Sequence, residues 1–95
     1  PPPPLPEVPD RGTIIATMAG LRGGLLGCAP SFDGRINFIM VISGETGEVQ
    51  AVSVENVENA DEAACMETVV LSARFPRFTR PELSIDYPYE LRQNR

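Results

Sequence analysis

Residues 34–76 read GRINFIMVISGETGEVQAVSVENVENADEAACMETVVLSARFP, and this stretch decides the fold of the chain. Large apolar residues alternate over 36–42, which is typical of a β-strand with one buried face. Ile39 and Val41 make the other face partly apolar, as expected for a central strand. Gly44 to Gly47 predicts a tight turn with both glycines at positive φ, and residues 49–57 form the returning strand.

In the returning strand we expect Val52 and Val54 to share one face, with Val49, Ala51 and Val57 on the opposite one. A helix is predicted from about Asp61 to Ala73. Asn59 or Asp61 would cap it, and Pro76 would end it. Its buried stripe is Met66, Val69, Val70 and Ala73.

The segment before this stretch predicts another helix, from Thr13 to about Leu26. Its apolar stripe is Ile14, Met18, Leu21 and Leu25. Asp10 or Thr13 would cap it. The pair Gly23-Gly24 has two interpretations: it ends the helix, or it lets the helix lie close to a neighbouring element.

A last strand is predicted from about Leu83 to Leu91. Pro88 cannot donate a ladder hydrogen bond, so this strand belongs at a sheet edge. The element order is α-β-β-α-β. A right-handed crossover then gives an α+β two-layer sandwich, with a three-stranded antiparallel sheet of order 2-1-3 and both helices on one face.

The 95 residues divide into a proline-rich linker end, 1–10, and one small domain, 11–95. We expect 1–10 to be a polyproline II spacer belonging to a longer protein. An alternative is that the Pro1-x-x-Pro4 pattern is a ligand for an aromatic-lined groove.

The net charge of −5, from thirteen acids and eight arginines, argues against nucleic acid as a partner. The chain has no histidine, which removes the commonest general base and metal ligand. We therefore expect no catalytic residues, no metal and no cofactor. No uninterrupted apolar stretch is long enough for a membrane span.

Two cysteines, Cys28 and Cys65, fall in or beside the two predicted helices. If both helices cover the same sheet face, the thiols can join in a disulfide, which needs an oxidising compartment. The alternative is two unrelated buried thiols.

Two charged groups are weaker candidates. Carboxylates at Glu55, Glu58 and Asp61 raise the hypothesis of glycosidic or calcium chemistry, but a solvated loop and a helix N-terminus explain them as well. A basic group, Arg74, Arg77 and Arg80, is a candidate for secondary docking of an acidic partner, or a set of solvated loop residues.

The main candidate site is the predicted edge strand, because an exposed edge invites pairing by another chain. Its residues are Ser84, Ile85, Asp86, Tyr87, Pro88 and Tyr89. The two tyrosines would provide anchoring surface, and Pro88 either protects the edge or limits pairing to one register.

The chain resembles the TonB C-terminal domain family over roughly Ile14 to Leu91. The motifs are Gly34, Gly47-Glu48-Val49, Asp61-Glu62-Ala63-Ala64 and Arg74-Phe75-Pro76. The cysteine pair and the Tyr87-Pro88-Tyr89 ending are similar to the subfamily at the C-terminus of AgmX/PglI-type gliding-motility proteins.

The resemblance implies a periplasmic domain, tethered by a proline-rich linker to an inner-membrane anchor upstream. It also implies force or energy transduction to an outer-membrane or periplasmic partner, whose peptide segment pairs with the edge strand. A second hypothesis is a structural domain that forms a homodimer or docks within an envelope complex. An enzyme acting on cell-wall sugar or peptide is the third and rests only on the carboxylates.

Overall fold

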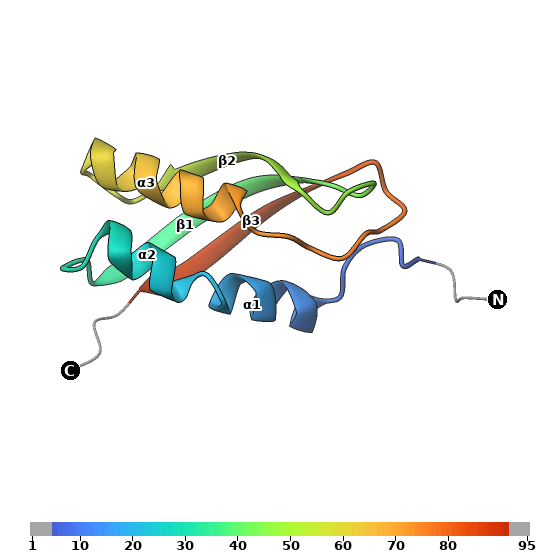
Figure 1. Ribbon diagram of the computed structural model, residues 1–95, viewed down its shortest axis with the longest axis horizontal. Helices are drawn as coiled ribbons and strands as arrows, with labels where there is room; N and C mark the ends of the chain where they lie inside the picture. Colours follow the sequence, from blue (N-terminus) through green and yellow to red (C-terminus); the bar gives the residue numbers. More distant parts are fainter. Residues whose placement is uncertain (1–4, 92–95) are drawn as a thin grey trace.

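The computed structural model describes residues 5–91; residues 1–4, with the first four prolines of the predicted spacer, and 92–95 lie outside the described part. The element order confirms the predicted α+β fold with sheet order 2-1-3 (Figure 1). The elements are α1 (Arg11–Ala19), α2 (Arg22–Cys28), β1 (Gly34–Ser43), β2 (Val49–Glu55), α3 (Ala60–Leu71) and β3 (Glu82–Leu91).

The core lies between the helices and one face of the sheet. β1 is the central strand and is antiparallel to both neighbours. Its inward side chains are fully buried: Ile36, Phe38, Met40 and Ile42. Each helix adds buried apolar residues to the same cluster: Met18 from α1, Leu25 from α2, and Met66 and Val70 from α3. The alternation in β1 therefore predicted the buried face correctly.

The predicted single N-terminal helix is two helices. α1 ends at Ala19, and the chain bends at Gly20 and Leu21 before α2 begins. Gly20 is a poor helix former, and the Leu21 amide bonds to the Met18 carbonyl at 3.1 Å, which tightens the last turn. The break lies between Met18 and Leu25, and both of these side chains are fully buried in the core. Asp10 caps α1, since its carboxylate accepts from the Thr13 amide at 2.8 Å.

The Gly23-Gly24 pair does not end the helix but lies inside α2. A Cβ at Gly24 would be 3.0 Å from Cγ1 of Val69 on α3, so the glycine permits the close approach of α2 and α3. Next to this contact the predicted disulfide is present: Cys28 and Cys65 are bonded, with Cα atoms 5.6 Å apart.

Helix α3 begins and ends earlier than predicted. Asn59 is the cap, and its side chain accepts from the Asp61 and Glu62 amides at 2.9 and 3.1 Å. The helix ends at Leu71, before Pro76, because Ala73 and Phe75 turn into the core instead of continuing the helix. Proline therefore follows the helix end without causing it.

The predicted faces of β2 are wrong at Val49. Ile42 pairs with Val49 while Val41 pairs with Ala51, so Gln50 is an extra residue in a β-bulge. The bulge shifts the alternation by one position. Val49 therefore joins the buried side, with Val52 and Val54 packed against the core from the same strand.

Positive φ was predicted for both turn glycines, Gly44 and Gly47, and the prediction is wrong for Gly44. Only Gly47 has positive φ, at 76°. The segment after α3 crosses directly over the turn: the Phe75 amide bonds to the Gly47 carbonyl at 2.9 Å, and the Phe78 amide to the Gly44 carbonyl at 3.0 Å. A Cβ added at Gly44 would lie 1.8 Å from the carbonyl oxygen of Arg80, and a Cβ added at Gly47 would lie 1.9 Å from the carbonyl oxygen of Phe75. Close backbone packing requires both glycines.

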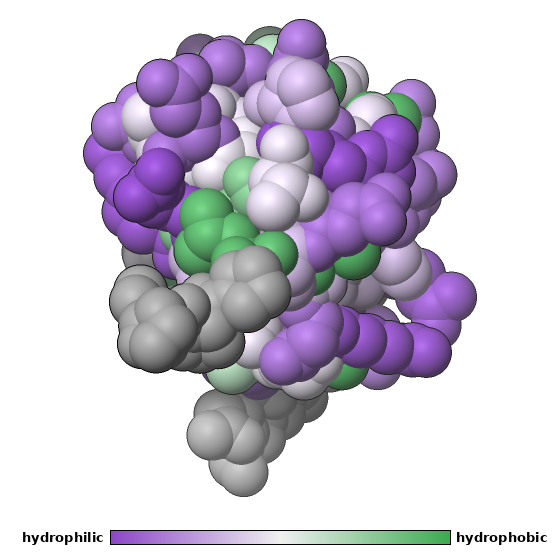
Figure 2. Space-filling model, turned by 90° about the vertical axis from the view of Figure 1, so that its right-hand side faces the viewer, coloured by the Kyte–Doolittle hydropathy of each residue, from purple (hydrophilic) through white to green (hydrophobic). Residues whose placement is uncertain are grey.

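Residues before α1 also contact this crossing segment. The amides of Thr79 and Arg80 donate to the carbonyls of Pro6 and Glu7 at 2.9 and 3.3 Å, and Pro9 is buried. The end of the molecule where this strap, residues 5–9, lies is mainly hydrophilic, with a small apolar area left of the centre and scattered apolar atoms toward the rim (Figure 2). The described part of the proline-rich segment is thus attached to the domain.

We expect Gly47→Ala to lower the free energy of unfolding by at least about 2 kcal/mol, because it combines left-handed backbone strain with a backbone clash. Gly23→Ala is the matched control. A Cβ at Gly23 meets nothing within 4 Å, so alanine there should be neutral or stabilise by up to about 1 kcal/mol. Urea unfolding measures both, and equal stabilities of the two variants would contradict the crossing geometry.

We expect the double variant Cys28→Ser, Cys65→Ser to lose about 2–4 kcal/mol of unfolding free energy, because the disulfide closes a loop across a sequence separation of 37. Wild-type protein under reducing conditions should match the variant. Identical urea midpoints for oxidised and reduced wild type would show that the bond contributes nothing to stability.

Candidate functional site

β3 is an edge strand, as Pro88 predicted. It pairs with β1 along its whole length, from Glu82 to Leu91, and no described strand pairs with its other side. β2 is the opposite edge, but it has only seven residues and is interrupted by the bulge. The longer and more regular edge therefore belongs to β3.

The backbone N–H and C=O groups of β3 point alternately toward β1 and away from the sheet. The Ser43 amide donates to Glu48, on the β2 side, whereas the Gly44 amide donates to Pro81, on the β3 side. Even-numbered residues of β1 thus direct their polar backbone groups toward β3. They pair with Leu83, Ile85, Tyr87 and Tyr89. Ser84, Asp86, Pro88 and Glu90 consequently direct theirs away from the sheet.

This direction explains why a proline is tolerated in β3. Pro88 stands opposite Asn37 at a position whose missing N–H would have pointed outward, so no bond to β1 is lost. The outer edge keeps the amide donors of Ser84, Asp86 and Glu90 and the carbonyl acceptor of Pro88. A strand added to this edge can therefore form backbone hydrogen bonds on both sides of Pro88, and only the bond that an N–H at Pro88 would have donated is missing.

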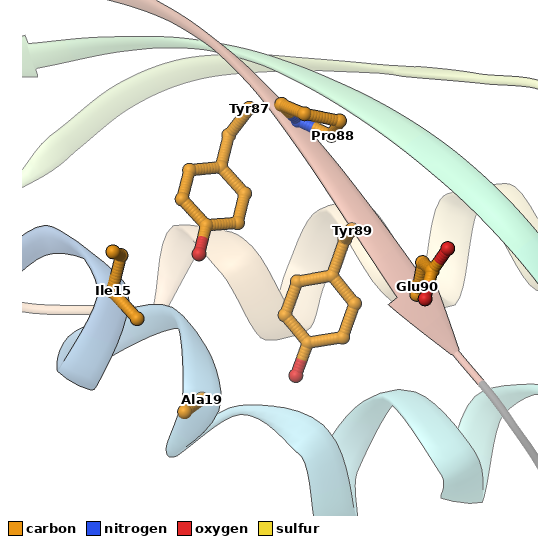
Figure 3. A pocket seen from close by; sticks show the side chains of 6 residues that line it. All are labelled: Ile15, Ala19, Tyr87, Pro88, Tyr89 and Glu90. Atoms are coloured by element: carbon orange, nitrogen blue, oxygen red, sulfur yellow. The ribbon is translucent and has the colours of Figure 1, made fainter.

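A groove runs between α1 and the edge of β3. Its two parts have volumes of about 350 and 200 Å³. The lining from β3 includes Ile85 and residues 86–90, and from α1 it includes Arg11, Ile14, Ile15 and Ala19. Figure 3 shows Ile15 and Ala19 opposite the two tyrosine rings. The structure thus places five of the six predicted edge residues, all except Ser84, on one groove wall.

The α1 wall was not among the predicted site residues. Ile15 is 45% exposed, and it lies outside the apolar stripe that predicted the helix. A large apolar residue on the face expected to be polar was the signal that could have identified it.

The two tyrosines have different roles. Tyr89 is only 7% exposed and packs edge-to-face on Phe38, with ring centroids 5.9 Å apart. Tyr87 is half-buried and lines both parts of the groove. Burial raises the pKa of the Tyr89 hydroxyl, and the nearby Arg22 partly opposes this. Tyr89 is therefore a core anchor, and Tyr87 is the tyrosine that the groove exposes.

On the open face of the sheet, β3 carries charged side chains. The Asp86 carboxylate accepts from Asn37 Nδ2 at 2.5 Å, and Glu90 forms an ion pair of 3.1 Å with Arg35. Glu82 is exposed on the same side of the strand. Along the edge, Ile85 and Tyr87 thus line the groove from the helix side, while the side chains of Glu82, Asp86 and Glu90 form an acidic row that begins at the groove rim and follows the open face.

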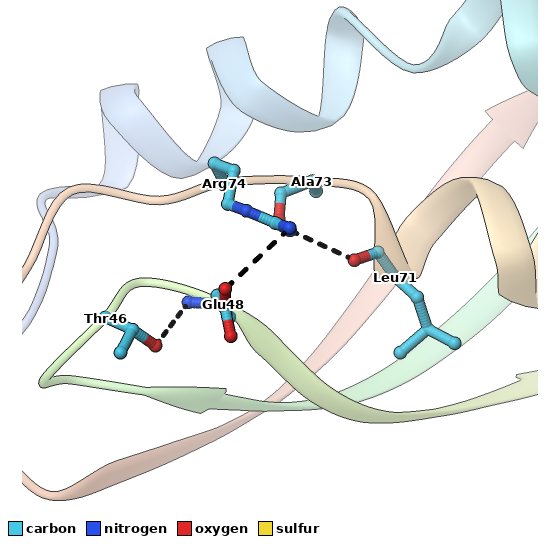
Figure 4. Close-up of polar contacts among 5 residues, drawn as sticks. All are labelled: Thr46, Glu48, Leu71, Ala73 and Arg74. Atoms are coloured by element: carbon cyan, nitrogen blue, oxygen red, sulfur yellow. Dashed lines mark hydrogen bonds and ion pairs between the residues drawn. The ribbon is translucent and has the colours of Figure 1, made fainter.

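The basic group is largely engaged in local structure. Arg74 Nη1 donates to the carbonyls of Leu71 and Ala73 at 3.2 and 3.0 Å, and Nη2 lies 3.8 Å from Glu48 (Figure 4). Arg77 Nε donates to the Glu45 carbonyl at 2.9 Å. Arg80 is exposed. These contacts hold the crossing segment on the hairpin, and docking by this group stays a prediction.

Neither the groove nor a third hollow in the described part of the chain brings the candidate carboxylates together. A hollow of about 480 Å³ is lined by Glu58 but by neither Glu55 nor Asp61. Within residues 5–91, no group of three or more His, Cys, Asp or Glu side chains could hold a metal ion. Across the same range, none of the helices has the length and apolar character needed to cross a membrane.

Comparisons of the chain with protein-family models, with curated proteins and with solved structures find no match. The TonB-like interpretation therefore stays a prediction from the sequence motifs.

We expect stability to fall as the pH rises above about 10, because an unfolded chain releases the Tyr89 proton near the ordinary pKa of 10.0 while the folded chain retains it. Below that pH the contribution is constant. Tyr89→Phe should flatten the decline in unfolding free energy above about pH 10. Equal slopes for wild type and variant would show that Tyr89 is not buried.

Proposed function

We propose that this chain is a non-enzymatic interaction module that captures an extended peptide segment on the β3 edge. The observation that carries the proposal is the combination of outward amides at Ser84, Asp86 and Glu90 with an apolar groove beside them. Backbone pairing supplies affinity in this mode of recognition, and alternate side chains in pockets supply specificity. The groove, at about 350 Å³ in its larger part, has room for side chains of such a segment.

We further propose that the module works in the periplasm as a TonB-like domain, tethered to the inner membrane. It would link an inner-membrane protein to an outer-membrane or envelope partner for force or energy transduction, as in gliding motility. The sequence motifs support this assignment, and the Cys28–Cys65 disulfide is compatible with an oxidising compartment.

The attachment of the strap is consistent with force transmission. Pro6 and Glu7 bond to the segment that leads directly into β3, and α1 continues from the strap along the groove. Tension on the spacer would therefore act close to a partner bound on β3.

A second candidate function is structural docking or dimerisation without peptide capture. The observation that favours it is the open face of the sheet, where Ile39 and Val41 are half-buried and no described helix covers them. Light scattering at high protein concentration distinguishes the two functions, because a strictly monomeric chain argues against self-association.

The proposed function is tested with peptides from periplasm-facing segments of outer-membrane proteins, titrated while amide resonances are recorded. We expect the shifts to centre on Ser84, Asp86 and Glu90. Ser84→Pro removes an outward donor without breaking the ladder to β1, so it should weaken binding about three- to tenfold. Ser84→Ala keeps the amide and is the matched control. Shifts confined to β2, or equal affinities of the two variants, would refute edge pairing.

A further inference from the structure

We infer that the segment captured on β3 is basic: an extended strand in which apolar residues alternate with lysine or arginine, two of the basic residues four positions apart. This inference rests on the proposed function and names the chemistry of its partner.

The charge of the β3 edge comes from one row of side chains. Glu82, Asp86 and Glu90 recur at every fourth residue, and all three are exposed on the open face of the sheet. Arg35 pairs with Glu90, and Asn37 donates to a single oxygen of Asp86. Glu82 and Asp86 therefore present negative charge that no described cation neutralises within ion-pair distance.

Strand geometry decides which side chains of a bound segment face the groove and which face the open side of the sheet. Side chains of a paired strand alternate between faces, and those directly across from each other have Cβ atoms about 5 Å apart. One set of partner side chains enters the groove beside Ile15, Ile85 and Tyr87. The other set lies on the open face beside Glu82 and Asp86, where only positive charge is complementary.

The same charges disfavour a second copy of this chain as the occupant of the β3 edge. Neither β2, VQAVSVE, nor β3, ELSIDYPYEL, contains a basic residue. Pairing β3 of one copy with β3 of another would bring acids together, and β2 would bring no cation to neutralise them, between chains that each carry a net charge of −5. Arg11 of α1 lines the larger part of the groove together with Asp86, but among the described residues no ion pair joins the two side chains.

The inference is tested with three synthetic eight-residue peptides, capped at both ends, that share alternating valines. In the first peptide two polar positions four apart are lysine; in the second they are glutamine; in the third they are glutamate. We expect the lysine peptide to bind about fivefold more tightly than the glutamine peptide, and the glutamate peptide to bind more weakly still. Raising the ionic strength should reduce the lysine advantage, because these charges are exposed.

Variants of the domain assign the effect to the acidic row. Glu82→Gln with Asp86→Asn should abolish the lysine advantage, so that the lysine and glutamine peptides bind this variant with equal affinity. Glu45→Gln with Glu58→Gln removes the same total charge away from the groove, and it should preserve the advantage.

Two outcomes separate the inference from the function. If the lysine and glutamine peptides shift the β3 amides with equal affinity, edge pairing stands and the basic partner is refuted. If none of the peptides perturbs Ser84, Asp86 or Glu90, both the partner and the edge-capture function are refuted.

Discussion

The structure depends on the backbone contact between the segment after α3 and the β1–β2 turn. Three bonds make this contact: Phe75 to Gly47 at 2.9 Å, Phe78 to Gly44 at 3.0 Å, and Gly44 to Pro81 at 3.1 Å. No side chain fits at either glycine. The contact fixes where β3 begins beside β1, and so it fixes the register of the whole β3 edge.

Register in turn decides what the edge presents. With Ile85 and Tyr87 bonded to β1, the amides of Ser84 and Asp86 face outward and Pro88 costs no ladder bond. A shift of one residue would bury the carboxylates and expose the tyrosines. The second wall of the groove depends on the bend at Gly20 and on the disulfide between α2 and α3, which together hold α1 beside the edge.

Much of this could be predicted from the sequence, because the informative signals were local. Alternation in 36–42 identified the central strand, and Pro88 identified the edge strand. The misses were tertiary. The bulge at Gln50 changed the face of Val49, and the N-terminal helix divided at Gly20. The apolar spacing around Gln50 and around Gly20 does not by itself reveal either feature. Packing against other elements selects the bulge and the position of the helix break.

The sequence by itself determined the element order, the buried face of β1 and the residue types along β3, because periodicity and proline chemistry act over neighbouring residues. It also supplied the cysteines, but their bond needed α2 and α3 on one face of the sheet. Only the tertiary structure decided that Ile15 faces Tyr87 across a groove and that an acidic row lies on the other side of the same edge. The groove joins residues far apart in the chain, because the bend at Gly20 and the packing of α2 place α1 beside the edge, while the register of β3 beside β1 decides which face each of its side chains takes.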